Sequence, residues 1–185
     1  MTSQDSFLPR RIPIQVAPAG ALAPRLELTV AEPSRILEAV LVRVEDLADV
    51  SRVRLFLSAG SGRVCCDAGA LTEALANVVV NAIQSSPAGG SVVVTSNEGR
   101  DAGHVWRVRD TGSGIPRRVF PYVGTPFFSR RNTGSGPRIV LARDVVERHD
   151  GVIQVKSTPG LGTLVSIWLP SVASRISSRR AHGFP

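Results

Sequence analysis

The order of helical and strand-like segments constrains the fold of this chain more than any other feature. Three segments carry apolar residues at helical spacing, and pairs of segments with alternating polarity, typical of half-buried strands, follow the helices. The expected helices span about 35–47, 68–85 and 137–149, and the expected strands span 53–57, 64–66, 91–96, 104–109, 152–157 and 163–169. Single helices interleaved with hairpin-connected strands predict an α+β fold. We expect a two-layer sandwich, with a mixed, mostly antiparallel sheet and its helices on one face.

The length and composition of the chain predict one folded domain with extended ends. A chain of 185 residues with 43% hydrophobic content can form one well-buried domain and is too short for two domains of ordinary size. Residues 1–32 hold four prolines and no helical periodicity, so we expect a linker or extended arm, followed by the domain at 33–170 and a basic disordered tail at 171–185. No apolar run approaches a membrane span and no signal peptide begins the chain, which predicts a cytoplasmic protein without a membrane span.

The net charge of +7 makes a nucleic-acid partner worth weighing. From Thr111 to Arg143 the sequence has no acidic residue and six arginines: Arg117, Arg118, Arg130, Arg131, Arg138 and Arg143. These arginines surround glycine-rich sequence, which suits a small polyanion such as a nucleoside triphosphate at least as well as a duplex. We therefore expect no nucleic-acid partner, and a solvated basic face is the alternative interpretation.

The helix expected at 68–85 carries a polar line on an otherwise apolar segment. Glu73, Asn77 and Asn81 are spaced i, i+4 and i+8, so they share one face. Asparagine is a mediocre helix former, and its amide oxygen is a neutral ligand of the kind that Mg²⁺ accepts while it bridges phosphates. The line indicates a metal-nucleotide site, unless it simply faces solvent.

Two glycine-rich turns flank the predicted phosphate region. Asp110 ends a strand whose buried face also holds Trp106 and Val108, and the turn Thr111–Pro116 follows it directly. A carboxylate beside a flexible turn can bind a polar ligand edge while the backbone approaches the ligand closely. Gly134-Ser135-Gly136 stands directly before a helix, where backbone N–H groups can meet phosphate.

Five motifs occur in a fixed order: an Asn-x-x-x-Asn-Ala helix, an Asp-x-Gly-x-Gly turn, a Pro-Phe-Phe segment, a Gly-x-Gly before a helix and a Gly-x-Gly-Thr hairpin. Together they resemble the ATP-binding catalytic domain of sensor histidine kinases, in the Bergerat-fold superfamily of gyrase, the heat-shock chaperone and MutL-type proteins. The resemblance covers about 33–170. It implies a Bergerat-type sandwich with an ATP lid, and ATP and Mg²⁺ as cofactors.

The resemblance also implies roles for individual residues. Asn81 matches the magnesium-ligating asparagine, Asn77 the polar residue one turn before it, and Asp110 the aspartate that accepts a hydrogen bond from the adenine amino group. The remaining matches are Gly112, Gly114 and Ile115 in the first glycine box, Phe128 in the F box, Gly134 and Gly136 in the second glycine box, Thr163 near the adenine pocket, and Arg131 at the position of a lid lysine.

Asn77 bears on the reaction itself. ATP-hydrolysing branches of the superfamily have a glutamate one turn before the metal asparagine, as the general base for water. An amide cannot accept a proton at neutral pH, and Glu73 lies a further turn back. The sequence therefore favours transfer of the γ-phosphate, assisted by Asn77 and Arg131, over hydrolysis.

Two departures from the family pattern stand out. Arg138 replaces the third glycine of the second box, so its side chain must either swing outward or take over a phosphate contact. None of the histidines His104, His149 and His182 lies in the helical, acidic context of a phosphoacceptor, and His149 is expected to cap a helix end. The expected partners are therefore ATP, a histidine-bearing dimerisation domain or phosphotransfer protein outside this chain, and a response regulator.

Three alternatives remain at this stage. The altered second glycine box would suit a non-catalytic nucleotide-binding or partner-binding module. Anti-sigma serine kinases also consist of a lone Bergerat domain. Asp110-Thr111-Gly112-Ser113 matches the active-site signature of aspartic proteases as well, which would require an almost all-β chain.

Overall fold

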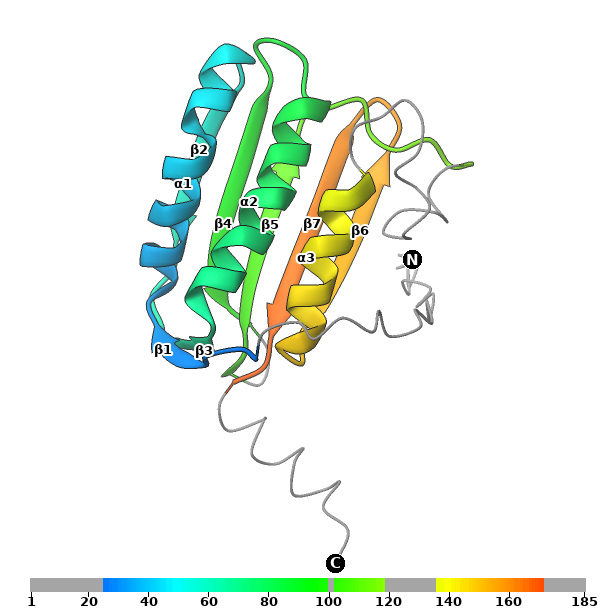
Figure 1. Ribbon diagram of the computed structural model, residues 1–185. Helices are drawn as coiled ribbons and strands as arrows, with labels where there is room; N and C mark the ends of the chain where they lie inside the picture. The colour runs from blue at the N-terminus through cyan, green and yellow to red at the C-terminus, as the bar shows by residue number, and fades with distance from the viewer. Residues whose placement is uncertain (1–24, 100–101, 119–135, 172–185) are drawn as a thin grey trace, which may run out of the picture.

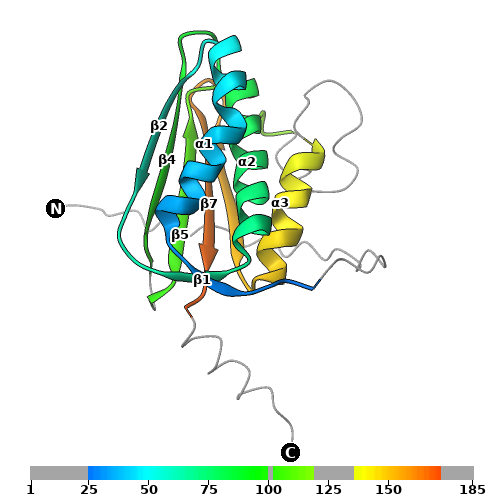
Figure 2. The same cartoon turned by 60° about the vertical axis from the view of Figure 1, so that its left-hand side comes forward.

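Three helices pack side by side on one face of a five-stranded sheet (Figures 1 and 2). The computed structural model describes residues 25–99, 102–118 and 136–171. The helices are α1 (Pro33–Val50), α2 (Ala68–Ser85) and α3 (Gly136–Arg148). The sheet has the order β2 (Arg54–Ala59), β4 (Ser91–Glu98), β5 (His104–Asp110), β7 (Gly162–Leu169) and β6 (Val152–Thr158). This architecture confirms the predicted α+β two-layer sandwich.

The sheet is mixed and mostly antiparallel, as predicted. β2 runs parallel to β4, and the pairs β4–β5, β5–β7 and β6–β7 are antiparallel. The chain leaves β2, passes through α2 and returns to start β4, which is the crossover that parallel neighbours require. The observed helices make an almost all-β aspartic protease fold impossible for this chain.

One expected pairing is wrong. The sequence suggested that the strands at 53–57 and 64–66 form a hairpin, but β3 (Val64–Cys66) pairs with β1 (Thr29–Ala31) in a separate two-stranded sheet. β2 instead pairs along its whole length with β4, from Arg54 opposite Ser91 to Ala59 opposite Ser96. Part of the predicted N-terminal arm is therefore a strand, and residues 1–24 and 172–185 lie outside the described residues.

α2 begins with a side-chain N-cap, whereas α1 begins without one. Asp67 caps α2, and its side chain accepts a hydrogen bond from the Ala70 N–H at 2.9 Å. α1 begins with Pro33 in its first turn and Glu32 as the N-cap, without a side-chain capping bond. None of the helices in the described part of the chain combines the length and apolar character that a bilayer crossing requires.

The core fills the space between the helices and the sheet. The inner face of β5 alternates as expected, with Trp106, Val108 and Asp110 buried and Arg107 and Arg109 exposed. The apolar stripe of α2 packs against this face, and its buried members are Leu71, Leu75, Val78, Val79 and Ile83. The alternation therefore puts a carboxylate at the inner edge of the core, beside α2.

His149 joins the ends of two helices inside the core. Its side chain is fully buried, its Nδ1 lies 2.7 Å from the Val145 carbonyl oxygen, and its Nε2 lies 2.9 Å from the Asp67 backbone nitrogen. A carbonyl only accepts and a backbone N–H only donates, so Nδ1 carries the proton and Nε2 is the acceptor. This neutral imidazole has the structural role predicted for it at the end of α3.

The buried His104 should make the stability of the domain depend on pH. Its Nε2 lies 2.6 Å from Ser96 Oγ and its ring packs against Trp106. Burial lowers the pKa of His104, which the charge of Glu98 offsets only in part. Below about pH 6.5 the unfolded chain therefore binds more protons than the folded one at this site, and stability falls as the pH falls.

Replacing His104 with glutamine should flatten this dependence. The slope of the unfolding free energy between pH 5 and 6.5 should decrease by up to about 1.4 kcal/mol per pH unit, the value for one proton. Urea denaturation at several pH values measures both slopes. Equal slopes for the two proteins would show that His104 titrates alike in the folded and unfolded states.

Candidate functional site

Asp110 is the buried carboxylate around which the candidate site is built. It ends β5 on the helix-facing side and is 5% exposed. Its Oδ1 accepts two hydrogen bonds, from the Gly112 N–H at 2.8 Å and from the Thr163 N–H at 3.1 Å. Both bonds use one oxygen, so the carboxyl group is held in a fixed orientation and Oδ2 is left to an external donor.

Burial raises the pKa of Asp110, and the hydrogen bonds from Gly112 and Thr163 counteract part of that effect. A carboxylate in this environment has given up solvation and retains acceptor capacity on one oxygen. It can therefore gain more from an N–H donor of a ligand than a solvent-exposed aspartate would.

Backbone hydrogen bonds fix the turn after Asp110 to the end of α2. The Thr111 N–H donates to the Ser91 carbonyl at 3.1 Å, and the Ser113 N–H donates to the Ser85 carbonyl at 3.3 Å. A Cβ atom on Gly112 would collide with the same Ser85 carbonyl, so no side chain fits at this position. The first glycine box is thus a close crossing of two backbones.

The β6–β7 hairpin closes the other side of the turn. Ser157 Oγ accepts from the Ile115 N–H at 2.8 Å, donates to the Gly162 carbonyl at 3.1 Å and lies 3.0 Å from Thr163 Oγ1. Gly114 has a φ of +67°, and a Cβ atom on it would collide with the Thr158 carbonyl. Asp110, the glycine turn and Thr163 therefore form one hydrogen-bonded unit.

Sequence reasoning missed Ser157 and the position of Gly162. Ser157 is an alternating strand residue with no motif of its own, and its register partner Thr163 is the only signal that the sequence offers for it. Gly162 lies directly over β5, because a Cβ atom there would collide with the Asp110 carbonyl. Both residues support Asp110 and Thr163.

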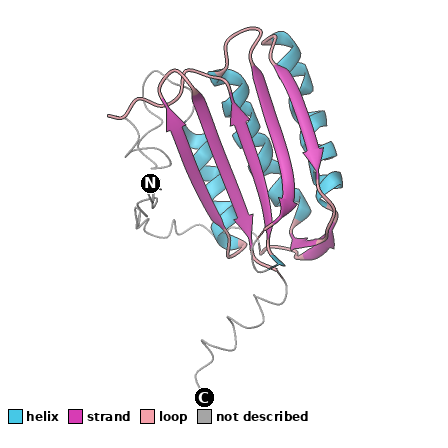
Figure 3. Cartoon of the chain, turned by 180° about the vertical axis from the view of Figure 1, so that it is seen from behind, coloured by secondary structure: helices cyan, strands magenta, loops and turns pink. Residues whose placement is uncertain are grey.

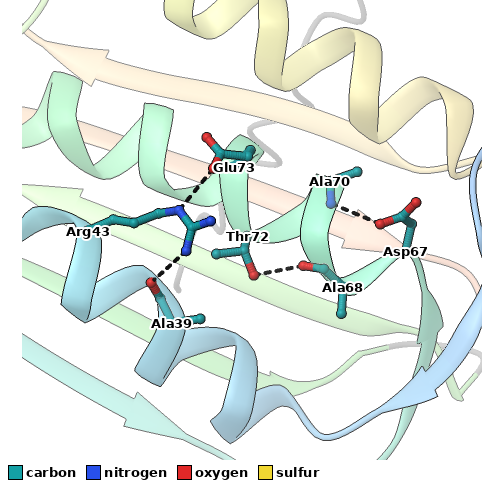
Figure 4. A network of polar contacts seen from close by, with 7 residues as sticks. All are labelled: Ala39, Arg43, Asp67, Ala68, Ala70, Thr72 and Glu73. Carbon is teal, nitrogen blue, oxygen red and sulfur yellow. Dashed lines mark hydrogen bonds and ion pairs between the residues drawn. The ribbon is translucent and has the colours of Figure 1, made fainter. Parts of the chain in front are cut away.

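The three polar residues predicted to share one face of α2 differ in how exposed they are. Asn81 is 8% exposed, Asn77 is half-buried and Glu73 is exposed. Figure 4 shows that Glu73 Oε1 takes a hydrogen bond from Arg43 Nε, at 2.9 Å, and that Arg43 also reaches the Ala39 carbonyl. The ion pair directs Glu73 toward α1, which supports the expectation that Glu73 is not a base for the site.

The start of α3 contributes Arg138, which the resemblance predicts to stand in place of a glycine. Its Nη1 donates to Gln84 Oε1 at 3.1 Å, so the guanidinium lies against the last turn of α2. Gln84 follows Asn81 by three residues, which puts the two positions about one helical turn apart. Gly136 begins α3, whereas Phe128, Arg131 and Gly134 lie outside the described residues, as does most of the expected lid.

Taken together, the described residues offer a fixed acceptor, a side-chain-free backbone turn and amide oxygens on a neighbouring helix. β5 and α2 pack against each other, so Asp110 and the two asparagines belong to one side of the sheet. An acceptor with one open oxygen suits the exocyclic amino group of a heterocyclic base. Amide oxygens suit a hard cation that takes its other ligands from phosphate and water.

Comparisons with known proteins agree with this arrangement. Residues 66–173 match the model of the histidine kinase-, DNA gyrase B-, and HSP90-like ATPase family. Sporulation kinase A of Bacillus subtilis is 36% identical over 104 residues, which cover 56% of this chain and 17% of that kinase. The matched part of this chain thus spans only about a sixth of the length of that kinase.

Two solved structures have the same fold. The mycobacterial sensor histidine kinase MprB has a TM-score of 0.68 at 26% identity, over 77% of this chain and 97% of that one. The histidine kinase ThkA, in a complex with the response regulator protein TrrA, has a TM-score of 0.68 at 20% identity, over 81% of this chain and 43% of that one.

Proposed function

Because the chain belongs to the histidine kinase-, DNA gyrase B- and HSP90-like ATPase family, we propose that it is the ATP-binding catalytic domain of a two-component histidine kinase. In this proposal the domain occupies residues 33–170 and transfers the γ-phosphate of ATP to a histidine on a separate dimerisation domain or phosphotransfer protein. A response regulator then receives the phosphoryl group. The structure of ThkA with a response regulator supports the assignment of such a partner.

The arrangement of Asp110 carries the proposal. Its Oδ1 is occupied by the N–H groups of Gly112 and Thr163, so Oδ2 is the atom that would accept the adenine amino proton. Gly112 and Gly114 would let the adenine approach the turn, with Ile115 beside it. Thr163 is tied to both Asp110 and Ser157, which fits a position at the wall of the adenine pocket.

The phosphate end of the site would be formed by α2, α3 and the lid. Asn81 would hold Mg²⁺, and bound Mg²⁺ supplies charge neutralisation for the β- and γ-phosphates. Arg138 lies against Gln84, from which its guanidinium is placed to reach a phosphate near the start of α3. Arg131, Phe128, Gly134 and Gly136 are proposed to complete this end, with Arg131 stabilising the transferred group.

Asn77 explains why transfer is proposed rather than hydrolysis. A general base for water must accept a proton, and the neutral amide of Asn77 does not. The only acid on the same line, Glu73, is exposed and paired with Arg43. A histidine nucleophile brings its own lone pair, so the domain needs to position ATP rather than activate water.

A binding assay followed by a transfer assay tests the function. We expect saturable binding of Mg-ATP in titration calorimetry, and then labelling of a separately supplied histidine-bearing dimerisation domain from γ-³²P-ATP. Binding without transfer to any supplied histidine domain would favour the non-catalytic module. No binding of ATP at all would reject both nucleotide-based functions.

Changing Asn81 to alanine should remove the effect of magnesium. In the parent protein Mg²⁺ should strengthen ATP binding, and the variant should lose roughly 10- to 100-fold in Mg²⁺ affinity because an amide ligand is gone. Magnesium titrations at fixed ATP measure this change. ATP affinity in EDTA serves as the control, since it should remain the same; an equal loss with and without Mg²⁺ would mean that Asn81 only maintains the fold of α2.

A further inference from the structure

The face of the five-stranded sheet that lies opposite the helices is basic. Figure 3 shows this face with the strands in front of the helices. Alternate residues of each strand point to it, and these include the exposed residues Arg54 of β2, Arg107 and Arg109 of β5, and Lys156 of β6. No position of the five strands that alternates onto this face holds Asp or Glu. The face therefore carries positive charge that its own strands do not neutralise.

Among the residues that the structure describes, the ion pairs lie away from this face. These ion pairs all join side chains of the helices, within α1, between α1 and α2, and within α3. None of them includes Arg107, Arg109 or Lys156. Like charges on one surface repel one another, so a partner with carboxylates gains by binding there.

Apolar side chains share this face with the cations. Phe56 is 52% exposed and Val93 is 36% exposed, and the two are register partners on β2 and β4. The same row continues through Arg109, Leu164 and Lys156, because Val93 faces Arg109, Arg109 faces Leu164, and Leu164 faces Lys156. With strands about 4.8 Å apart, the row spans roughly 19 Å. It has an apolar end at β2 and a mixed cationic end at β6.

We propose that this face docks a protein partner through an acidic amphipathic helix that lies across the strands. A span of roughly 19 Å corresponds to about 13 helical residues, or between three and four turns. The apolar side of such a helix covers Phe56, Val93 and Leu164, while its flanking carboxylates pair with Arg109, Lys156 and Arg107. The cations of the face favour a partner with carboxylates, and the apolar side chains in the same row favour a partner that also has an apolar side.

A protein partner suits the face better than single-stranded nucleic acid does. Nucleic-acid strands bind sheets through aromatic platforms on which bases stack. Phe56 is the only aromatic side chain in the row, and Trp168 of β7 is half-buried, with its indole against Gly99 and Gly103 of the β4–β5 connection. Aliphatic side chains between the cations instead match an amphipathic helix.

The docking face and the proposed nucleotide site use opposite sides of the same two strands. Arg109 directly precedes Asp110 on β5, and Leu164 directly follows Thr163 on β7, so alternation turns the members of each pair to opposite faces. A partner on the outer face leaves Asp110 accessible. Docking and ATP binding can therefore be measured separately, and the failure of one does not imply failure of the other.

Fluorescence anisotropy with a defined probe tests the proposal. The probe is a labelled, designed helical peptide of about 16 residues with a leucine stripe flanked by glutamates. The test variant is R107Q/R109Q/K156Q, and the matched control is R35Q/R43Q/R63Q, which removes the same charge from exposed sites outside the five-stranded sheet. At 0.15 M salt we expect the test variant to lose about tenfold in affinity and the control to lose no more than about twofold.

Further measurements make the result decisive. Amide chemical shift changes should concentrate on β2, β4, β5, β6 and β7, the Phe56→Ser variant should weaken binding several-fold, and ATP affinity should stay unchanged in every variant. Equal losses in the two triple variants would overturn the proposal, because binding would then follow net charge alone. Tighter binding of oligo-dT or of phosphatidylglycerol vesicles than of the peptide, with the same dependence on Arg107, Arg109 and Lys156, would overturn it in favour of a nucleic acid or a membrane.

Discussion

Replacing Asp110 with asparagine is expected to weaken ATP binding roughly 10- to 100-fold while the domain stays folded. The amide oxygen of asparagine can still accept the N–H groups of Gly112 and Thr163, which now bind Oδ1. The amide nitrogen then takes the place of Oδ2, so a donor replaces the acceptor that the adenine amino group needs. Titration calorimetry with ATP measures the loss.

Stability and affinity should respond to Asp110 in opposite directions. Burial raises the pKa of Asp110, so the folded state binds this proton more tightly than the unfolded chain. The carboxyl group therefore favours folding at low pH, and this contribution is lost as the pH rises through the raised pKa. ATP binding needs the ionised form and should weaken as the pH falls through the same value. Asp110→Asn should remove both dependences.

A second aspartate provides a matched control. Asp67 also accepts hydrogen bonds from two backbone N–H groups, those of Ala70 at 2.9 Å and Glu27 at 3.0 Å, and these bonds lower its pKa. Asp67 stands at the start of α2 (Figure 4), whereas the turn after Asp110 is bonded to Ser85 at the other end of that helix. Asp67→Asn should leave ATP affinity unchanged. Equal ATP affinities in all three proteins would mean that the nucleotide binds elsewhere.

The sequence predicts those parts of the fold that depend on local patterns. Apolar stripes and caps place α2 at 68–85 and α3 within about a residue of the observed Gly136–Arg148, because periodicity and capping act within a few residues. The pairing of β1 with β3 escapes prediction. It joins Thr29–Ala31, within a proline-containing segment, to Val64–Cys66 across more than thirty positions, and short strands leave no periodic signal.

The candidate site likewise has one part that local sequence patterns predict and another that depends on contacts between distant segments. The bond from the Gly112 N–H to Asp110 spans two residues and follows from the motif, since aspartate commonly accepts from the backbone two positions later. The bond from the Thr163 N–H spans 53 residues, and the resemblance to a family supplied the only expectation that Thr163 lies near the pocket. The contact of Arg138 with Gln84 depends on how α3 packs on α2, which no short pattern determines.

Gly162→Ala is expected to destabilise the domain by about 3 kcal/mol or more and to abolish measurable ATP binding. Gly162 has a φ of +93°, which an alanine adopts only at a cost, and the added Cβ atom would collide with the Asp110 carbonyl. Backbone, rather than a flexible side chain, lies in the way, so β5 and β7 must separate where Asp110 and Thr163 meet. Urea denaturation and ATP titration measure the two effects.

Gly160→Ala in the same hairpin isolates the collision from the backbone strain. Gly160 also has a positive φ, +79°, but a Cβ atom on it would meet nothing within 4 Å. Its replacement should therefore cost only the left-handed conformation, roughly 1–2 kcal/mol, and leave ATP affinity intact. The difference between the two variants measures the contact between the Gly162 backbone and Asp110. If both variants lost the same stability and kept the same affinity, the close crossing would not hold the carboxylate in place, and the orientation of Asp110 would have to come from the Gly112 and Thr163 hydrogen bonds alone.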